Sequence, residues 1–308
     1  ASESARRFFS CDADLKERHC AGSQGYKNDP VVGFEGFVVR TVYPEGFLWP
    51  SQPRYLERDF TLLHGLLGML AVELLEVCLR HLGVREGQPL EEMLASLLDG
   101  PDCTDLTLCS PSMLGFLHYN YDPAGCGSGG VIKSYAQHVD DTLVTLSIRS
   151  SYPALQVRPF GPEAREGRGR PRGGWGDAWV DVEAQMTDRD VLVHAGDSLA
   201  LLSGHYFPAL VHQVDGRGIA QALGSTGGRG AHDLPGARIS TPFFLRPRRG
   251  ARLGVLPREV APRVPAVPGG SLGVSFDQLE GNVGLCRDAW PWKRAQYYED
   301  VEVKAVRP

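Results

Sequence analysis

The stretch that decides the fold is YAQHVDDTLVTL, residues 135–146. Its β-branched and apolar residues predict a β-strand. In a strand, residues two positions apart point to the same face, so we expect His138 and Asp140 to project together. The stretch therefore predicts an imidazole and a carboxylate side by side on a strand of a β-rich core.

A second histidine follows in a later predicted strand. Residues 209–214 read ALVHQV and place His212 in an apolar segment, after a turn that follows another predicted strand at residues 197–202. Two histidines and one carboxylate form the facial triad that holds non-haem Fe(II) and leaves coordination positions open. His138, Asp140 and His212 are therefore the predicted metal ligands and the predicted catalytic residues.

Two further histidines lie near these strands, and we expect neither to bind the metal. His205 lies in the turn before His212, where no apolar strand orients it. His194 ends a predicted strand at residues 191–194 and is expected to be structural. The predicted metal group therefore has three members.

A cation and a hydroxyl open the next predicted strand, RISTPFFL at residues 238–245. A guanidinium presents a planar fork of donors that matches a carboxylate, and a nearby hydroxyl adds a further donor. Arg238 and Ser240 are therefore predicted to grip the carboxylate of a co-substrate near the metal.

The order of these motifs resembles a family of Fe(II)/2-oxoglutarate-dependent oxygenases, the one that includes isopenicillin N synthase, flavonoid oxygenases and gibberellin oxidases. The resemblance covers about half of the chain, in collinear order. The matching segments are Asn120-Tyr121, His138-x-Asp140, Leu155-Gln156-Val157, Trp179-Val180-Asp181-Val182, Gly196-Asp197, His212-x-Val214 and Arg238-x-Ser240-x-Pro242-Phe243-Phe244.

The resemblance implies a fold. We expect a mainly β protein with flanking α-helices around a double-stranded β-helix, or jelly-roll, core. The chain is expected to form a single oxygenase domain over residues 1–308. Within it, residues 1–113 would be an N-terminal helical and extended region, residues 114–250 the core, and residues 251–308 a C-terminal helical cover.

The resemblance also implies an activity: a dioxygenase of secondary metabolism that uses Fe(II), 2-oxoglutarate and O₂, with ascorbate as a candidate reductant. The far carboxylate of 2-oxoglutarate would pair with Arg238 and Ser240, and the products would include succinate and CO₂. An unactivated C–H bond of a small metabolite would be oxidised, with hydroxylation, desaturation and ring closure all open. Asn120 and Tyr121 are further cofactor-binding candidates, although Asp122 stands where the family usually has a second tyrosine.

Two other functions stay open. Members similar to isopenicillin N synthase or aminocyclopropane-carboxylate oxidase keep the Arg–Ser pair without using 2-oxoglutarate, so the chain could be such an oxidase or cyclase. A jelly-roll module that holds a metal without catalysis is the second alternative. Succinate release and O₂ uptake would distinguish the three.

Three residues are weaker candidates for contacts with the substrate. Arg149 follows the predicted metal strand and could bind a second anionic group. Phe276 and Trp292 are candidates by resemblance, because a C-terminal segment of this kind often covers the cavity in the family.

The composition limits the classes of partner that we expect. A formal net charge of −5 over 308 residues gives no sign of a nucleic-acid or membrane partner, and no apolar run reaches the roughly 18 residues of a membrane span. The seven cysteines are an odd number without paired spacing, which favours reduced thiols in the cytoplasm. We expect one core and a monomer that acts on a small molecule.

Helices are predicted around the β-rich part. Pro53 stands at the predicted first helical position and Gly83 at the end of the clearest one, and shorter helices are expected at residues 89–98 and from about Ser275. The first helix is expected to pack on the outside of the β-core through one apolar stripe at helical spacing. Its members are Phe60, Leu63, Leu67, Leu70, Leu74 and Val77.

Overall fold

The structure is a computed structural model that describes residues 2–21, 24–29, 34–40, 47–51, 53, 55–99, 110–119, 135–159, 178–215, 238–265 and 274–276. Asn120, Tyr121 and Trp292 lie outside the described residues, as does nearly all of the predicted C-terminal helix. The described helices are α1 (Ser2–Phe9), α2 (Ala13–Glu17), α3 (Leu56–Leu82), α4 (Gln88–Leu97), a 3₁₀ turn (Glu183–Gln185) and α5 (Asp197–Leu202).

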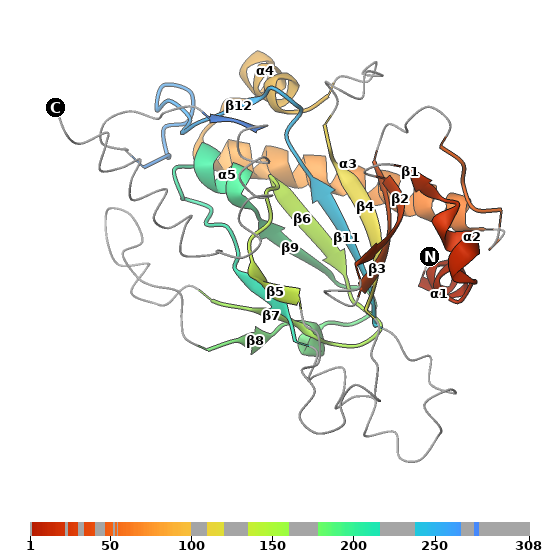
Figure 1. The fold of residues 1–308 in the computed structure, drawn as a ribbon. Coiled ribbons are helices and arrows are strands. Elements are labelled where there is room, and N and C mark those ends of the chain that lie inside the picture. The colour runs from red at the N-terminus through yellow and green to blue at the C-terminus, as the bar shows by residue number, and fades with distance from the viewer. Residues whose placement is uncertain are drawn as a thin grey trace.

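Two antiparallel sheets dominate the described chain (Figure 1), and a two-stranded one joins β12 (Arg252–Leu253) to β13 (Val274–Ser275). This confirms a mainly β fold with flanking helices. The larger sheet has the order β1 (Cys20–Ala21), β2 (Gln24–Asp29), β3 (Phe34–Arg40), β4 (Met113–Tyr119), β11 (Arg238–Leu245), β6 (Val144–Ile148), β9 (Val191–Ala195). The smaller has the order β5 (Tyr135–His138), β10 (His212–Val214), β7 (Leu155–Val157), β8 (Val180–Asp181).

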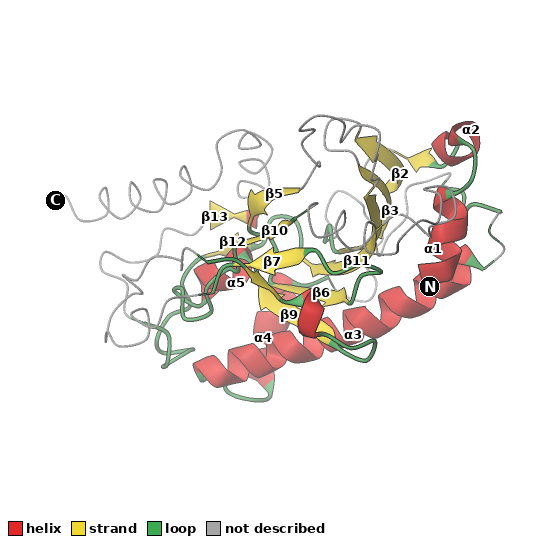
Figure 2. Ribbon diagram, turned by 90° about the horizontal axis from the view of Figure 1, so that it is seen from below, coloured by secondary structure: helices red, strands yellow, loops and turns green. Residues whose placement is uncertain are grey.

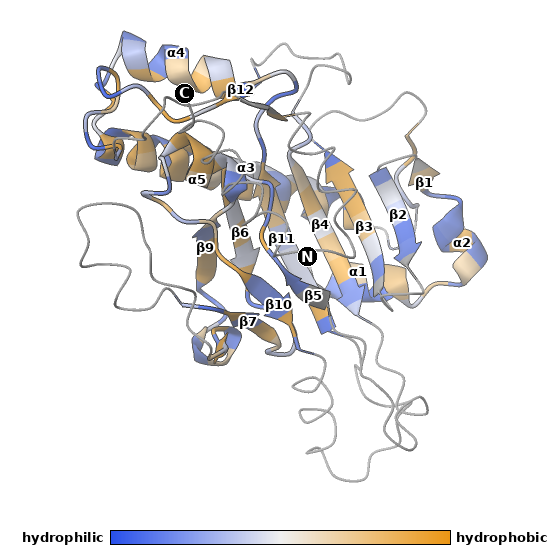
Figure 3. Cartoon of the chain, turned by 60° about the vertical axis from the view of Figure 1, so that its left-hand side comes forward, coloured by the Kyte–Doolittle hydropathy of each residue, from blue (hydrophilic) through white to orange (hydrophobic). Residues whose placement is uncertain are grey.

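The seven-stranded sheet has two different faces, because side chains alternate along each strand. On β11, Phe243 and Leu245 are buried in the main hydrophobic core, whereas Ser240 and Phe244 line a cavity on the opposite face. Figure 3 shows apolar colouring on β3 and β4 in the sheet, next to the more polar β2. One face of the sheet therefore builds the core, and the other is available for a functional site.

Helix α3 covers the core face of this sheet. Figure 2 shows α3 along one side of the sheet, with β5, β7 and β10 on the other side. The helix ends as predicted at Gly83, whose φ of +97° is favourable for glycine. Its start was predicted wrongly, since the first helical residue is Leu56 and not Pro53.

The apolar stripe of α3 was also predicted only in part. Val77 is 56% exposed, and Leu63, Leu70 and Leu74 are only partly buried. Because α3 is apolar on most of its circumference, several stripes have helical spacing, and only the packed sheet selects one. The buried residues of α3 are Leu56, Phe60, Leu67, Ala71, Leu75, Leu79 and Leu82.

The length and composition of α3 also correct an expectation about membrane spans. Residues 56–82 form a helix that is long and apolar enough to cross a membrane by those two criteria. The same helix packs against the seven-stranded sheet, with Leu75 and Leu79 fully buried. By themselves, length and composition do not separate a core helix from a membrane helix.

The predicted metal strand is not continuous. Strand β5 ends at His138, residues 139–143 leave the smaller sheet, and β6 begins at Val144 in the larger one. Asp140 therefore lies in a connection between two sheets, where strand alternation does not apply. Residues 197–202 were also predicted wrongly, since they form the short helix α5 and not a strand.

Candidate metal centre

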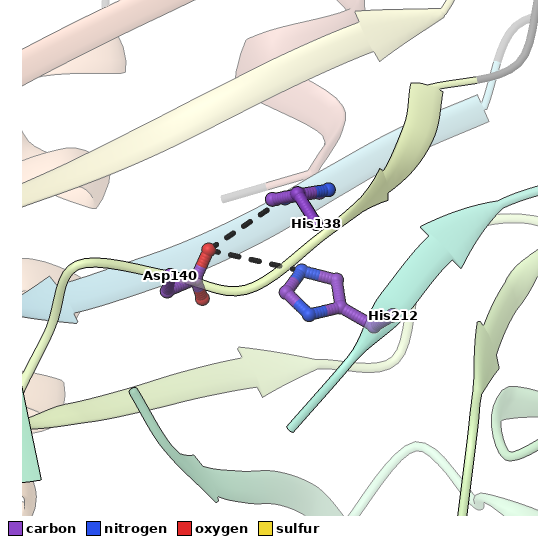
Figure 4. A group of neighbouring side chains, drawn as sticks. All are labelled: His138, Asp140 and His212. Carbon is purple, nitrogen blue, oxygen red and sulfur yellow. Dashed lines mark ion pairs between the residues drawn. The ribbon is translucent and has the colours of Figure 1, made fainter. Parts of the chain in front are cut away.

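Three side chains from two parts of the chain lie next to one another (Figure 4). His138 at the end of β5 pairs in register with His212 at the start of β10, and their ring centroids lie 4.2 Å apart. Asp140 Oδ1 lies 3.7 Å from Nε2 of His138 and 3.7 Å from Nε2 of His212. The ligand atoms of the three residues all lie within 4.8 Å of one another, a group that could hold one metal ion.

The connection that carries Asp140 is fixed by the start of α5. The backbone N–H of Asp197 donates to Asp140 O at 2.8 Å, and that of Ser198 donates to Thr142 O at 3.1 Å. Ser198 Oγ also donates to the backbone oxygen of Asp141 at 2.7 Å. A Cβ at Gly196 would collide with Thr142 and lie 2.7 Å from Asp140 O, so this close approach requires glycine.

A third histidine stands beside the carboxylate. His194 Nε2 lies 3.6 Å from Asp140 Oδ2, which also accepts a 2.7 Å hydrogen bond from Thr145 Oγ1. Sequence reasoning treated His194 as structural only. Its position follows from the pairing of β9 with β6, in which His194 is opposite Thr145, and such a register between distant segments is not readable from a single strand.

The local electrostatics suit a metal. Burial alone would raise the pKa of Asp140, but the imidazoles of His212, His194 and His138 and the Thr145 hydroxyl together lower this pKa to about 2. Burial lowers the pKa of His194 and of His212. A carboxylate and neutral imidazoles are the protonation states in which these groups bind a metal ion.

Arg238 is buried with only part of its guanidinium paired. Nη2 donates to the two carboxylate oxygens of Glu183 at 3.0 and 3.2 Å, and Nε donates to Tyr152 O at 3.2 Å. Nη1 is buried and has no hydrogen-bond partner among the described residues. Arg238 is 1% exposed, so Nη1 is a donor without an acceptor on the cavity side of β11. Glu183 was not singled out by sequence reasoning, because the two partners are 55 residues apart in the chain.

The triad and Arg238 face one cavity of about 360 Å³. Its floor is the inner face of the seven-stranded sheet, and the smaller sheet contributes residues on the other side. Asp141 and Arg246, which form a 2.7 Å ion pair, also border it. The floor includes Gly36, Val38, Met113, Leu117, Tyr119, Thr145, Ser147, His194, Arg238, Ser240, Pro242 and Phe244, and the smaller sheet adds His138, Leu155, His212 and Val214.

Sequence comparison identifies relatives that are isopenicillin N synthases. The protein from Streptomyces clavuligerus is 25% identical over 64% of this chain and 48% of its own length. The one from Lysobacter lactamgenus is 30% identical over 36% of this chain and 28% of its own length. The chain thus spans about half, or less, of the curated relatives that it matches. No family model matches the chain.

Solved structures share the fold at low sequence identity. A full-length Neurospora crassa protein, solved in complex with alpha-KG, aligns with a TM-score of 0.62 at 19% identity over 92% of this chain and 79% of its own. JOX2, in complex with 2OG, Fe and JA, aligns with a TM-score of 0.60 at 18% identity over 90% of this chain and 70% of JOX2. The sequence relatives and the solved structures therefore point to the same family resemblance.

The chain is similar to Fe(II)/2-oxoglutarate oxygenases in sequence and in fold. The resemblance stated from the sequence motifs is confirmed at the level of the family. In this chain, the predicted site residues His138, Asp140, His212, Arg238 and Ser240 all line the same cavity.

Of the three weaker substrate candidates, Arg149 and Phe276 do not line that cavity, and Trp292 lies outside the described residues. Arg149 is exposed and its Nη1 lies 2.9 Å from Asp188 Oδ1, so it belongs to a surface pair. Phe276 is fully buried in the hydrophobic core, where its backbone N–H donates to Ala251 O at 2.9 Å. Both assignments are corrected, because chain position alone does not show which way a side chain faces.

Proposed function

We propose that this protein is a non-haem Fe(II)/2-oxoglutarate-dependent oxygenase that oxidises an unactivated C–H bond of a small molecule and releases succinate and CO₂. The observation that carries the proposal is one cavity that contains both a two-histidine, one-carboxylate group and a buried guanidinium whose Nη1 has no acceptor among the described residues. The proposal includes a single domain whose two sheets form a double-stranded β-helix core.

The donor set fits a ferrous ion. His138 and His212 each offer an imidazole nitrogen and Asp140 one carboxylate oxygen, and this combination is typical of Fe(II) oxygenases with open coordination positions. When bound, the iron would supply O₂ activation, with 2-oxoglutarate as the electron donor. The protein's part is to hold the three ligand atoms together and to present the substrate from the cavity side.

Arg238 and Ser240 fit the far carboxylate of 2-oxoglutarate. A buried guanidinium N–H without a partner is unfavourable unless an acceptor reaches it, and a ligand carboxylate would satisfy Arg238 Nη1. Ser240 is two positions further along β11 and lines the same cavity, so its hydroxyl can donate to the same anion. The complexes of the Neurospora crassa protein with alpha-KG and of JOX2 with 2OG support this assignment.

A second candidate function is an oxidase or cyclase of the same fold that does not use 2-oxoglutarate. The sequence relatives, all isopenicillin N synthases among those matched, favour this alternative. The counter-charge that Glu183 provides to Arg238 is compatible with it as well, because the guanidinium is already neutralised. Succinate production separates the two functions, since only the first consumes 2-oxoglutarate.

The substrate is proposed to be a small molecule. A cavity of about 360 Å³ is in the range of small-ligand sites, and JOX2 was solved with the small ligand JA. Hydroxylation, desaturation and ring closure are all within the proposal. A monomer in the cytoplasm, without nucleic-acid or membrane partners, is also part of it.

The test is O₂ uptake by the Fe(II)-loaded protein with 2-oxoglutarate and a panel of small metabolites, with succinate measured in parallel. We expect substrate-stimulated O₂ uptake with matching succinate release. His138→Ala and Asp140→Ala should abolish both, because each removes a metal ligand. Asp188→Ala, at a carboxylate that is 91% exposed, is the matched control and should behave as the wild type.

Two results decide against the proposal. O₂ uptake without succinate would favour the 2-oxoglutarate-independent oxidase. Wild-type iron content and turnover in Asp140→Ala would show that Asp140 does not hold a catalytic metal.

A further inference from the structure

We propose that His194, together with Thr145, is a positioning residue that holds Oδ2 of Asp140 so that Oδ1 faces the metal. The inference rests on the proposed function, because it concerns how the same metal ligand is oriented. It assigns a role to a histidine outside the triad.

The two oxygens of Asp140 have different neighbours. Oδ1 lies 3.7 Å from Nε2 of His138 and 3.7 Å from Nε2 of His212, so it belongs to the metal side. Oδ2 accepts the 2.7 Å hydrogen bond from Thr145 Oγ1 and lies 3.6 Å from His194 Nε2. One oxygen of the carboxylate therefore faces the two ligand histidines, and the other faces Thr145 and His194.

Strand register brings Thr145 and His194 to this oxygen. His194 on β9 and Thr145 on β6 are direct partners in the seven-stranded sheet, and both line the cavity. Directly opposite side chains on one face of a sheet lie close together, so the two can approach the same carboxylate oxygen. The Thr145 hydroxyl is itself 2.8 Å from Thr142 Oγ1, on the connection that carries Asp140. The backbone of both strands fixes this arrangement.

His194 is not a fourth ligand of the same group. The described residues whose ligand atoms lie within 4.8 Å of one another are His138, Asp140 and His212, without His194. The His194 ring instead lies against the His212 ring, with centroids 5.0 Å apart and planes tilted by 56°. His194 is 8% exposed, so its ring is held by these contacts and not by solvent.

Groups behind a metal ligand set its orientation and strengthen its binding. A carboxylate can turn about its Cβ–Cγ bond and present either oxygen or both, unless donors hold one of them. Removing such a supporting partner typically weakens metal affinity by about 10- to 100-fold. In this protein the Thr145 hydroxyl donates to Oδ2, and the His194 ring lies beside the same oxygen with Nε2 3.6 Å away.

The experiment uses Co(II) as the probe, added to the full chain after a chelator has stripped it of metal. Co(II) affinity is measured by titration calorimetry, and the visible d–d absorption reports the geometry of the ligands. We expect His194→Leu and Thr145→Val each to weaken Co(II) binding about 10- to 100-fold and to shift the absorption. His194→Gln, which places an amide N–H near the same oxygen, should recover most of the affinity.

The matched control is His64→Leu. His64 is a largely buried histidine on α3 that contacts Phe60 and Phe243 on the core side of the sheet. This substitution should leave Co(II) affinity and the absorption unchanged, which separates the positioning role from a general effect of losing a buried imidazole.

The outcomes are distinct. Wild-type Co(II) affinity and absorption in a folded His194→Leu overturn the inference, and so does failure of His194→Gln to bind better than His194→Leu. Circular dichroism checks the fold. If His194→Leu does not fold, Thr145→Val decides, and wild-type Co(II) affinity and absorption in that variant overturn the inference. A wild-type protein that binds no Co(II) contradicts the proposed function itself.

Discussion

Arg238 and Glu183 form a buried ion pair beside the cavity. Their side chains are 1% and 2% exposed, and Glu183 also accepts backbone hydrogen bonds from Ala154 and Leu155 at 2.8 and 2.9 Å. Desolvation would raise the pKa of Glu183, but Arg238 and these backbone donors lower it, so the pair is ionised. The carboxylate thus holds Arg238 in an orientation in which Nη1 has no acceptor among the described residues.

Glu183→Gln should strongly destabilise the fold. It leaves the Arg238 guanidinium buried without a counter-charge, and breaking a buried ion pair in this way costs about 3 kcal/mol or more. Urea unfolding of the metal-free protein measures the loss. The exposed Glu259→Gln is the control and should change the free energy of unfolding by about 0.5 kcal/mol or less.

Added 2-oxoglutarate should raise the melting temperature of Glu183→Gln more than that of the wild type, because the ligand would supply the missing negative charge. Equal stability of Glu183→Gln and wild type would show that the pair does not hold Arg238 in place.

At the scale of elements, the contact between α5 and the connection 139–143 sets the position of Asp140. Gly196 has φ −101°, which any residue can adopt, so glycine is required by the close approach of Thr142 and not by backbone conformation. Gly196→Ala should therefore cost about 1–3 kcal/mol of stability through overpacking. It should also weaken metal binding, because the connection must move.

Gly65→Ala is the control for that substitution. Gly65 lies inside α3, and a Cβ there would meet nothing within 4 Å. The alanine should raise stability by up to about 1 kcal/mol through helix propensity, with metal binding unchanged. Thermal unfolding and Co(II) titration of both variants check the pair, and a Gly196→Ala protein with wild-type stability and affinity would argue against this contact.

Helix α3 offers a test of which stripe is buried. Leu75 is fully buried, whereas Leu66 is 52% exposed on the same helix. Leu75→Ala should cost about 2–5 kcal/mol, and Leu66→Ala about 0.5 kcal/mol or less. Denaturant unfolding of the two variants measures the difference. Similar losses in both would mean that α3 packs through a different face.

For the whole molecule, short motifs could be read from the sequence, whereas contacts between distant segments could not. The order of His138, Asp140, His212, Arg238 and Ser240 was readable because each motif is a few residues long, and the structure brings the five to one cavity. Asp140 was expected there for the wrong reason, since it lies between two sheets and not on a strand.

What could not be predicted depends on how distant segments pair. His194 and Glu183 reach the site through the register of β9 with β6 and through packing around residues 150–155, and a one-residue slip would turn a strand's side chains to the other face. The predicted substrate contacts of Arg149 and Phe276 were wrong for the same reason, because their positions in the chain did not reveal which face they occupy. Helix α3 has leucines on several faces, so helical spacing alone did not identify the buried stripe.

The whole protein should lose stability as the pH falls from 7 to 5. Burial lowers the pKa of His64, His194 and His212 in the folded state, so below about pH 6.5 the unfolded chain binds protons that the folded chain does not. Each histidine then contributes up to about 1.4 kcal/mol of loss per pH unit. Asp140, with its pKa lowered to about 2, contributes only in stronger acid.

Urea unfolding of the metal-free protein between pH 5 and pH 7 measures this dependence, and His64→Leu should reduce its slope by the share of one histidine. A free energy of unfolding that is constant or that rises toward pH 5 would mean that these imidazoles are already charged when folded.

The most direct test of the metal centre is the stoichiometry of Fe(II) bound under anaerobic conditions by the wild type, His212→Ala and Asp188→Ala. The account predicts one ion per chain for the wild type and Asp188→Ala, and none held by His212→Ala at the same free Fe(II). An unchanged single ion in His212→Ala, or no bound iron in the wild type, would contradict it.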